Sequence, residues 1–273
     1  MWGKVLGTLF GFLFGRFIGA IFGLYIGHLF DRSMRSEFEQ KGGFSRFFAG
    51  GSASDRQAIF FHATFSVMGH IAKSNGRVTD VHIQAANMLM EHMGLKGNQK
   101  TEAQEAFREG KLAGFNFEST LKDFKRSVFG RREILQMFVE IQIQAAYSDG
   151  VIETQERDLL YAVGKALGFS DADMKALLKR WEAEFRFHQQ KQQNGHSRSQ
   201  PASKEAIEDA YKVLGVSSDC SEAEVKKAYK KQMNQHHPDK LVSKGLPPEM
   251  MELAKGKTQD IQAAYDMIRQ KVS

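Results

Sequence analysis

The sequence predicts an all-helical protein with an amino-terminal membrane-spanning helix, a helical domain in the middle of the chain and a small helical domain at its end. Three observations lead to this prediction. Residues 5–30 are almost entirely apolar and carry glycine at every fourth position. From residue 55 onward apolar residues recur at helical spacing, without the convincing alternation that strands require. A polar segment then precedes a last helical group around the tripeptide His-Pro-Asp.

The composition is that of an ordinary globular chain with a mild excess of positive charge. The 273 residues carry a formal net charge of +6, which fits an acidic protein partner or an anionic membrane surface as well as nucleic acid. The cluster of basic residues in the last domain lies on one short helix and carries no recognised nucleic-acid-binding motif, so we expect no nucleic-acid partner. The single cysteine, Cys220, excludes an intramolecular disulfide and a CxxC zinc pattern.

Residues 7–30 are predicted to form a transmembrane helix after a short periplasmic segment, residues 1–6. About 20 apolar residues suffice to cross a bilayer, and this run is longer. A secretory signal peptide would have a shorter apolar core followed by a small-x-small cleavage site. Here the run continues into "YIGHLFDRSMR" (25–35) without such a site. We therefore expect a retained anchor.

The glycines of this run predict that two such helices pair. In water each interior glycine would cost a helix about 1 kcal/mol relative to alanine. In lipid the helix forms regardless, and small residues four apart let two helices approach closely. A homodimer through this face is the prediction, and a glycine-rich monomeric span is the alternative. The residues concerned are Gly7, Gly11, Gly15, Gly19, Gly23 and Gly27.

The charges that flank the apolar run predict its orientation. Lys4 stands alone before the run, whereas Arg32, Arg35, Lys41 and Arg46 follow it. Positively charged flanks stay on the cytoplasmic side. The amino terminus is therefore expected in the periplasm, and the bulk of the chain in the cytoplasm.

A juxtamembrane tether and a helical domain are expected next. Residues 31–54 end in a segment rich in glycine and serine, typical of a flexible connection. Residues 55–187 are predicted to be a helical domain, because apolar residues recur at helical spacing between capping residues and Gly-containing turns. The expected helices cover residues 55–73, 79–94, 132–150, 156–168 and 171–187.

Two segments of this domain echo each other. "AKSNGRVT" (72–79) is similar to "AYSDGVIE" (146–153) at an offset of 74 residues, and an apolar helix follows each. This pattern of helix, Asn/Asp-Gly turn and second helix resembles the TerB-like (tellurite-resistance type) fold.

The TerB resemblance also raises the question of a metal ion. Acidic residues after the turn have been suspected of binding a cation in that family, and their counterparts are Asp149, Glu153 and Glu156. The equivalent positions 74 residues earlier hold Asn75, Thr79 and His82 instead. Turn chemistry and helix-start acids explain such residues equally well, and oxygen-ligand sites need several converging carboxylates. We expect neither a metal nor a cofactor, with these three acids as weak candidates.

The last domain, residues 205–273, is expected after a flexible linker, residues 188–204. Ser221 and Glu224 form a capping box that starts a basic helix. Pro238 cannot continue that helix. His237 and Asp239 are therefore expected in a loop beside the basic helix.

The ordered segments "DAYKVLGV", "VKKAYKK", "HHPDK" and "IQAAYDMI" resemble a J-domain, the module of DnaJ co-chaperones. The resemblance implies a DnaK-type chaperone as partner and implies that the chain is not itself an enzyme. His237, Pro238 and Asp239 would stimulate ATP hydrolysis by that chaperone. Docking would fall to Lys226, Lys230, Lys231 and Tyr229.

The chain departs from the J-domain pattern at three positions. Gln232 stands where a leucine is usually buried, Thr258 where a phenylalanine is common, and His236 replaces a common tyrosine. The first two reduce apolar burial, so an isolated J-domain is expected to lose stability.

Anchor, TerB-like middle and J-domain together resemble the membrane-anchored DnaJ-like co-chaperones of Gram-negative bacteria. That resemblance implies an inner-membrane location and a membrane sensor-kinase client, with links to envelope-stress phosphorelay signalling and capsule (colanic acid) synthesis. Generic client binding is not expected, because the Gly/Phe-rich segment, zinc ribbons and client-binding domain of DnaJ are missing from the sequence. The alternative is a metal- or stress-responsive TerB-type membrane scaffold with the J-domain secondary.

Overall fold

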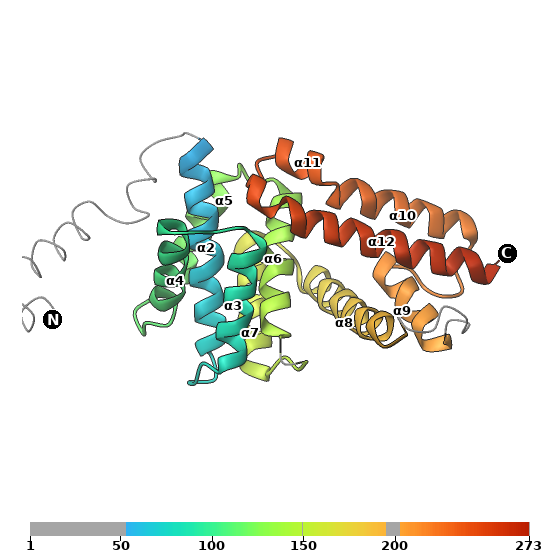
Figure 1. Ribbon diagram of the computed structural model, residues 1–273, viewed down its shortest axis with the longest axis horizontal. Coiled ribbons are helices and arrows are strands. Elements are labelled where there is room, and N and C mark those ends of the chain that lie inside the picture. The colour runs from blue at the N-terminus through green and yellow to red at the C-terminus, as the bar shows by residue number, and fades with distance from the viewer. Residues whose placement is uncertain (1–52, 149, 195–202, 273) are drawn as a thin grey trace, which may run out of the picture. The chain divides into compact units, whose positions relative to one another are not determined.

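Every regular element that the structure describes is a helix, which confirms the predicted all-helical fold class. The computed structural model describes residues 53–148, 150–194 and 203–272 (Figure 1). None of the helices in these residues has both the length and the apolar character needed to cross a membrane. The predicted span with its glycines, and the tether through residue 52, lie outside the described residues.

Seven helices make up what we call the central domain. Helix α2 is its middle element, because its side chains are buried on most sides, as the uniformly apolar sequence predicts. Helix α6 is equally apolar and also largely buried. The bounds are α2 Ala53–Lys73, α3 Asp80–His92, α4 Asn98–Gly110, α5 Phe117–Ser127, α6 Arg132–Ala146, α7 Thr154–Leu167 and α8 Asp171–Asn194.

Aromatic packing joins the central helices. The rings of Phe124 on α5 and Phe138 on α6 lie 4.4 Å apart between centroids, and Phe60 on α2 meets Phe124 edge-on at 5.4 Å. All three side chains are fully buried. Helix α4 comes close to α2 through Gly110, where a Cβ atom would lie 1.8 Å from the Ser66 carbonyl oxygen. This contact therefore requires a residue without a side chain.

The remaining helices form what we call the carboxyl-terminal domain. They are α9 Lys204–Leu214, α10 Glu222–His236, α11 Pro238–Ser243, the 3₁₀ turn Pro248–Met250 and α12 Met251–Val272. Helices α10 and α12 lie side by side (Figure 1). The capping box predicted at the start of α10 is present, with the Ser221 N–H donating to Glu224 Oε2 at 2.8 Å.

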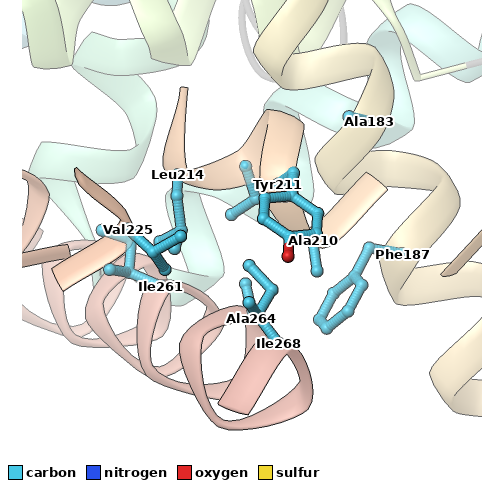
Figure 2. Close-up of a cluster of buried hydrophobic side chains, with 10 residues drawn as sticks. Ala183, Phe187, Ala210, Tyr211, Leu214, Val225, Ile261, Ala264 and Ile268 are labelled. Carbon is cyan, nitrogen blue, oxygen red and sulfur yellow. The ribbon is translucent and has the colours of Figure 1, made fainter. Parts of the chain in front are cut away.

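Helix α8 differs from its predicted extent and contributes to both domains. It continues to Asn194, so the first part of the segment expected to be a flexible linker is helical. Its amino-terminal half packs on α6 and α7, where Asp173 pairs with Arg132 of α6 and Met174 lies against Gly164 of α7. Its second half supplies Ala183 and Phe187 to the apolar core between α9, α10 and α12 (Figure 2). The apolar stripe of α8 is thus completed by the carboxyl-terminal domain.

Candidate functional site

The His-Pro-Asp tripeptide marks the change from α10 to the short helix α11. His237 caps α11 with extended dihedrals (φ −61°, ψ 124°), and Pro238 occupies the first helical position. Proline suits that position because its missing N–H would have no helical partner there. Asp239 is exposed in the first turn, while His237 and Pro238 are half-buried. The break predicted from Pro238 is therefore present, although Asp239 belongs to a short helix rather than to a loop.

The predicted docking lysines lie on the outer surface of α10. Lys226, Lys230 and Lys231 are all exposed. Val225, on another side of the helix, is buried in the core of the domain. Residues four apart share one face of a helix, so Lys226 and Lys230 present two charges side by side.

Tyr229, the fourth predicted docking residue, has contacts within its own domain. Its ring stacks on Tyr265 of α12 with 4.2 Å between centroids. Its hydroxyl donates to Gln262 Oε1 at 2.5 Å. The side chain is half-buried and ties α10 to α12. A docking role for Tyr229 would therefore use only the part of the ring that these contacts leave open.

The three departures from the J-domain pattern are buried and polar. Gln232 accepts a hydrogen bond from Arg180 of α8 at 3.2 Å. His236 Nε2 lies 3.8 Å from Glu140 Oε1 of α6. Thr258 donates to the Lys255 carbonyl oxygen within α12. Gln232 and His236 thus both meet the central domain.

His236 is held neutral by its surroundings. Burial lowers its pKa to about 4, an effect that the attraction of Glu140 opposes and the positive charges of Lys257 and Arg180 reinforce. At neutral pH the imidazole therefore fills space between the domains without carrying charge.

Lys257 and two carboxylates lie between α12 and the central domain, and we call Glu140, Glu184 and Lys257 the charged junction. Lys257 Nζ donates to Glu184 Oε2 at 2.5 Å and lies 3.5 Å from Glu140 Oε2. It also lies 4.8 Å from the centre of the Trp181 ring. All three charged side chains are at least nine-tenths buried.

The two carboxylates of the junction respond differently to the single ammonium group. Burial alone would raise the pKa of Glu140, but Lys257, His236 and Arg180 outweigh it and bring that pKa to about 2. The pKa of Glu184 is raised, because burial and the negative charges of Glu140 and Asp260 exceed the attraction of Lys257. One positive charge therefore does not fully compensate two buried carboxylates.

Sequence reasoning did not find the charged junction. Glu184 and Lys257 stand among other charged residues in their helices, where a solvated position is the usual expectation, whereas Glu140 stands between Val139 and Ile141 in the apolar α6. A usable signal is the apolar pair Ala183 and Phe187 around Glu184, which shows that this part of α8 has a buried side.

The weak metal candidates fall into two groups. Asp149 lies outside the described residues. Glu156 accepts a hydrogen bond from the Glu153 N–H at 3.1 Å in a capping box, and its other oxygen lies 3.2 Å from His82 Nε2. His82 and Glu156 each lie three residues after one of the two echoing segments, at the same offset of 74 residues, and the fold brings these equivalent positions together.

A different trio comes close enough to share a metal ion within the residues that the structure describes. It consists of Glu184, His188 and Asp260, whose ligand atoms lie within 4.8 Å of one another. The trio already contains ion pairs: Lys257 bonds to Glu184, and His188 Nε2 lies 2.7 Å from Asp260 Oδ2. Its geometry is that of a charge network joining α8 to α12.

The helix order, the tripeptide at the start of α11 and the exposed lysine face together define a J-domain protein. A family model described as "DnaJ domain" matches residues 209–273, and one described as "Tellurite resistance protein TerB" matches residues 61–179. Residues 1–55 match a model described as "Co-chaperone DjlA transmembrane domain". The chain belongs to the DjlA family of membrane-anchored co-chaperones.

Curated relatives support this assignment over almost the whole chain. The chain is 50% identical over 268 residues to "Co-chaperone protein DjlA" of Shewanella oneidensis, covering 98% of this chain and 97% of the relative. The protein of the same name from Photobacterium profundum is 48% identical over 272 residues, with 98% of each chain covered. That of Vibrio cholerae is 46% identical over 279 residues, with 98% and 97% covered. The comparison with solved structures gave no match.

Proposed function

We propose that the chain stimulates ATP hydrolysis by a DnaK-type chaperone through its J-domain and directs that chaperone to partners near the membrane. The observation that carries this proposal is the arrangement of α10 and α11. Lys226, Lys230 and Lys231 are exposed on α10, and the exposed Asp239 follows the end of that helix.

The proposed mechanism uses charge and position rather than covalent chemistry. A lysine face accelerates encounter with an acidic surface, in a way that salt weakens. The Asp239 carboxylate can accept a charge-assisted hydrogen bond from an arginine of the partner. The reacting phosphate belongs to the chaperone's nucleotide, so we propose that this chain is not itself an enzyme.

Steady-state ATPase assays of DnaK with the full chain in nanodiscs test this proposal. We expect the wild-type chain to stimulate ATP hydrolysis and His237→Gln to abolish the stimulation. His92→Gln changes an exposed histidine of α3 and should behave as wild type. Equal stimulation by the wild type and His237→Gln would refute a role for the tripeptide.

A charge-reversed pair separates docking from the tripeptide. Lys226→Glu with Lys230→Glu should weaken stimulation and reduce its salt dependence. Lys165→Glu with Lys175→Glu makes the same change of net charge at exposed positions of the central domain. If both pairs act alike, only net charge matters and the docking face is wrong.

We also propose the topology and pairing of the anchor. The family match of residues 1–55 to a transmembrane domain supports a single pass through the bacterial inner membrane. The flanking charges support a periplasmic amino terminus, and the glycine spacing supports a homodimer. Replacing Gly11, Gly15 and Gly19 by leucine should leave insertion intact and abolish crosslinked dimers. Persisting dimers would exclude this face.

The client remains a proposal that rests on resemblance. A membrane sensor kinase, envelope-stress phosphorelay signalling and capsule (colanic acid) synthesis are the proposed setting. Crosslinking in membranes, followed by identification of proteins bound to the central domain, tests it. Recovery of DnaK alone would argue against a dedicated client.

A metal-responsive scaffold is the second candidate function. It is favoured by the proximity of Glu184, His188 and Asp260. A bound ion would have to compete with the Lys257 ammonium group for Glu184. Calorimetry with Ca²⁺ and Zn²⁺ on the full chain decides, since a flat titration removes this function.

A further inference from the structure

We infer that the central domain is a fixed partner of the J-domain, held by Lys257 between Glu140 and Glu184, and that it holds the J-domain with its lysine face outward. The first half of this inference concerns packing within the chain and stands independently. The second half, that the held arrangement is the working one, rests on the proposed function.

Helix α8 is the first link between the domains, because it completes the core of the J-domain. Ala183 and Phe187 are buried in one cluster with Tyr211, Leu214 and other side chains of α9, α10 and α12 (Figure 2). Both residues precede residue 209, where the family match to the J-domain begins. A J-domain cut at that residue would therefore expose part of its own core.

Polar contacts from α8 reinforce this shared core. Arg186 donates two hydrogen bonds to the Asp209 carboxylate, at 3.0 and 2.8 Å, in a bidentate arrangement. Arg180 donates to Gln232. Gln232 thus has a partner at the position where a leucine would otherwise be buried, and that partner lies outside the J-domain.

The charged junction is the second link and joins α12 to both α6 and α8. Its three charged side chains are buried, and removing Lys257 would leave two buried carboxylates without their positive partner. Lys257 therefore has a positioning role: it touches no proposed partner, but it sets how the J-domain lies on the central domain.

The two faces of α10 explain why this arrangement leaves the docking residues open. Gln232 and His236 are four residues apart and meet the central domain. Lys226 and Lys230 are also four apart and are exposed. At 100° per residue, the direction midway between positions 226 and 230 is about 120° around the helix from the direction midway between positions 232 and 236. The buried and exposed residues of α10 therefore lie on different faces of the helix.

A peripheral contact holds the end of α11. Lys244 Nζ donates to Glu133 Oε1 at 2.7 Å, and Arg131 Nη1 donates to the Lys244 carbonyl oxygen at 2.5 Å. Both Lys244 and Glu133 are more than one-third exposed. This contact marks the accessible rim of the interface.

Amide hydrogen exchange of the full chain in nanodiscs tests the first half of the inference. Lys257→Met should speed exchange in α12 and the second half of α8 at least tenfold, while α2 and α4 keep their protection. Lys255→Met is the matched control, because Lys255 lies on the same helix in an exposed ion pair with Glu252. Equal exchange in these two variants would overturn the inference.

A variant without the junction's charges separates lost charge balance from lost packing. Glu140→Gln and Glu184→Gln combined with Lys257→Met leave no buried charge among the three positions. We expect exchange within about threefold of wild type, because removal of a whole network is tolerated where removal of one partner is not. Should Lys257→Met unfold the chain, Lys257→Gln takes its place with the same two outcomes, because it also leaves Glu140 and Glu184 without their positive charge.

A crosslink across the rim tests the second half. In a Cys220→Ser background, Glu133→Cys and Lys244→Cys are joined by a short bis-maleimide, which keeps the J-domain on the central domain. The crosslinked chain should retain DnaK stimulation within about twofold of the uncrosslinked chain. A loss of tenfold or more would show that the held arrangement is inhibited and would overturn the second half. If the uncrosslinked chain fails to stimulate, the proposed function fails instead.

Discussion

The apolar core of the central domain and the charged junction are both buried, but they depend on their surroundings in different ways. The burial of Phe60, Phe124 and Phe138 stabilises the fold at any pH, because these side chains have no group that titrates. The charges of Lys257 and Glu184 are tolerated in the interior as a pair, whereas either charge buried without the other would destabilise the fold. An apolar core therefore tolerates changes of conditions, whereas a buried ion network is sensitive to the loss or titration of any one member.

The largest effect is expected from a substitution in the apolar core of the central domain. Phe138→Ala should lower the free energy of unfolding by about 3–5 kcal/mol, because it leaves a cavity against Phe60 and Phe124. Chemical denaturation measures the change. Phe129→Ala is the control: this ring is 71% exposed, so its removal should cost less than about 1 kcal/mol. Similar costs at both positions would mean that the aromatic cluster is not the core.

The second effect uses pH to act on the interface through His236. His236 titrates at about 4 in the folded chain against an ordinary value of 6.5, while Glu140, Lys257 and Arg180 are the charged groups around it. The unfolded chain therefore takes up a proton first as pH falls, and the folded chain loses stability between pH 6.5 and 4. The expected loss between pH 7 and 4.5 is about 2–3 kcal/mol.

The variant His236→Gln shows how much of the stability loss at low pH comes from protonation of His236. Thermal unfolding of both chains across pH 4.5–7 should give a clearly flatter profile for the variant. Glu140 does not contribute in this range, because its lowered pKa removes stability only below about pH 4.5. Glu184 has the opposite sign, since its raised pKa favours the protonated folded form as pH falls. Identical slopes in the two chains would exclude His236 as the titrating group.

The third prediction tests whether the leucine that J-domains usually bury would also suit position 232 of this chain. Gln232→Leu restores the residue that J-domains usually bury, but it takes a hydrogen-bond partner from Arg180. We expect a cost of about 1–2 kcal/mol in the full chain, because a charged donor loses its acceptor. Denaturation monitored on the carboxyl-terminal domain measures it. A gain in stability would show that apolar burial outweighs this contact.

The contrast between apolar burial and buried polar contacts explains which elements could be predicted from the sequence. Helices α2 and α6 are apolar on most sides, and Thr79 and Ser221 mark helix starts through their capping chemistry, so these features were visible. Helices α4 and α5 were missed because each buries only a narrow stripe in a polar sequence, such as Leu121 and Phe124 in α5.

The candidate site also has a part that could be predicted from local sequence and a part that could not. Pro238 ends α10 for a local reason, so the position of the tripeptide followed from the sequence. The charged junction depends on residues 117 positions apart, Glu140 and Lys257, and charge alone does not say which residues meet. The continuation of α8 to Asn194 was missed because its last residues are polar and its burial comes from another domain.

The smallest effect is expected at the rim, where the same type of ion pair is solvated. Lys244→Met should cost between about 0.2 and 1 kcal/mol, because Lys244 and Glu133 are both more than one-third exposed. High salt should reduce this cost further, since screening acts on exposed charges. Lys257→Met, with its partners buried, should keep most of its effect in salt. Denaturation of both variants at low and high ionic strength measures this difference. Equal salt sensitivity would mean that water reaches the charged junction as freely as the rim.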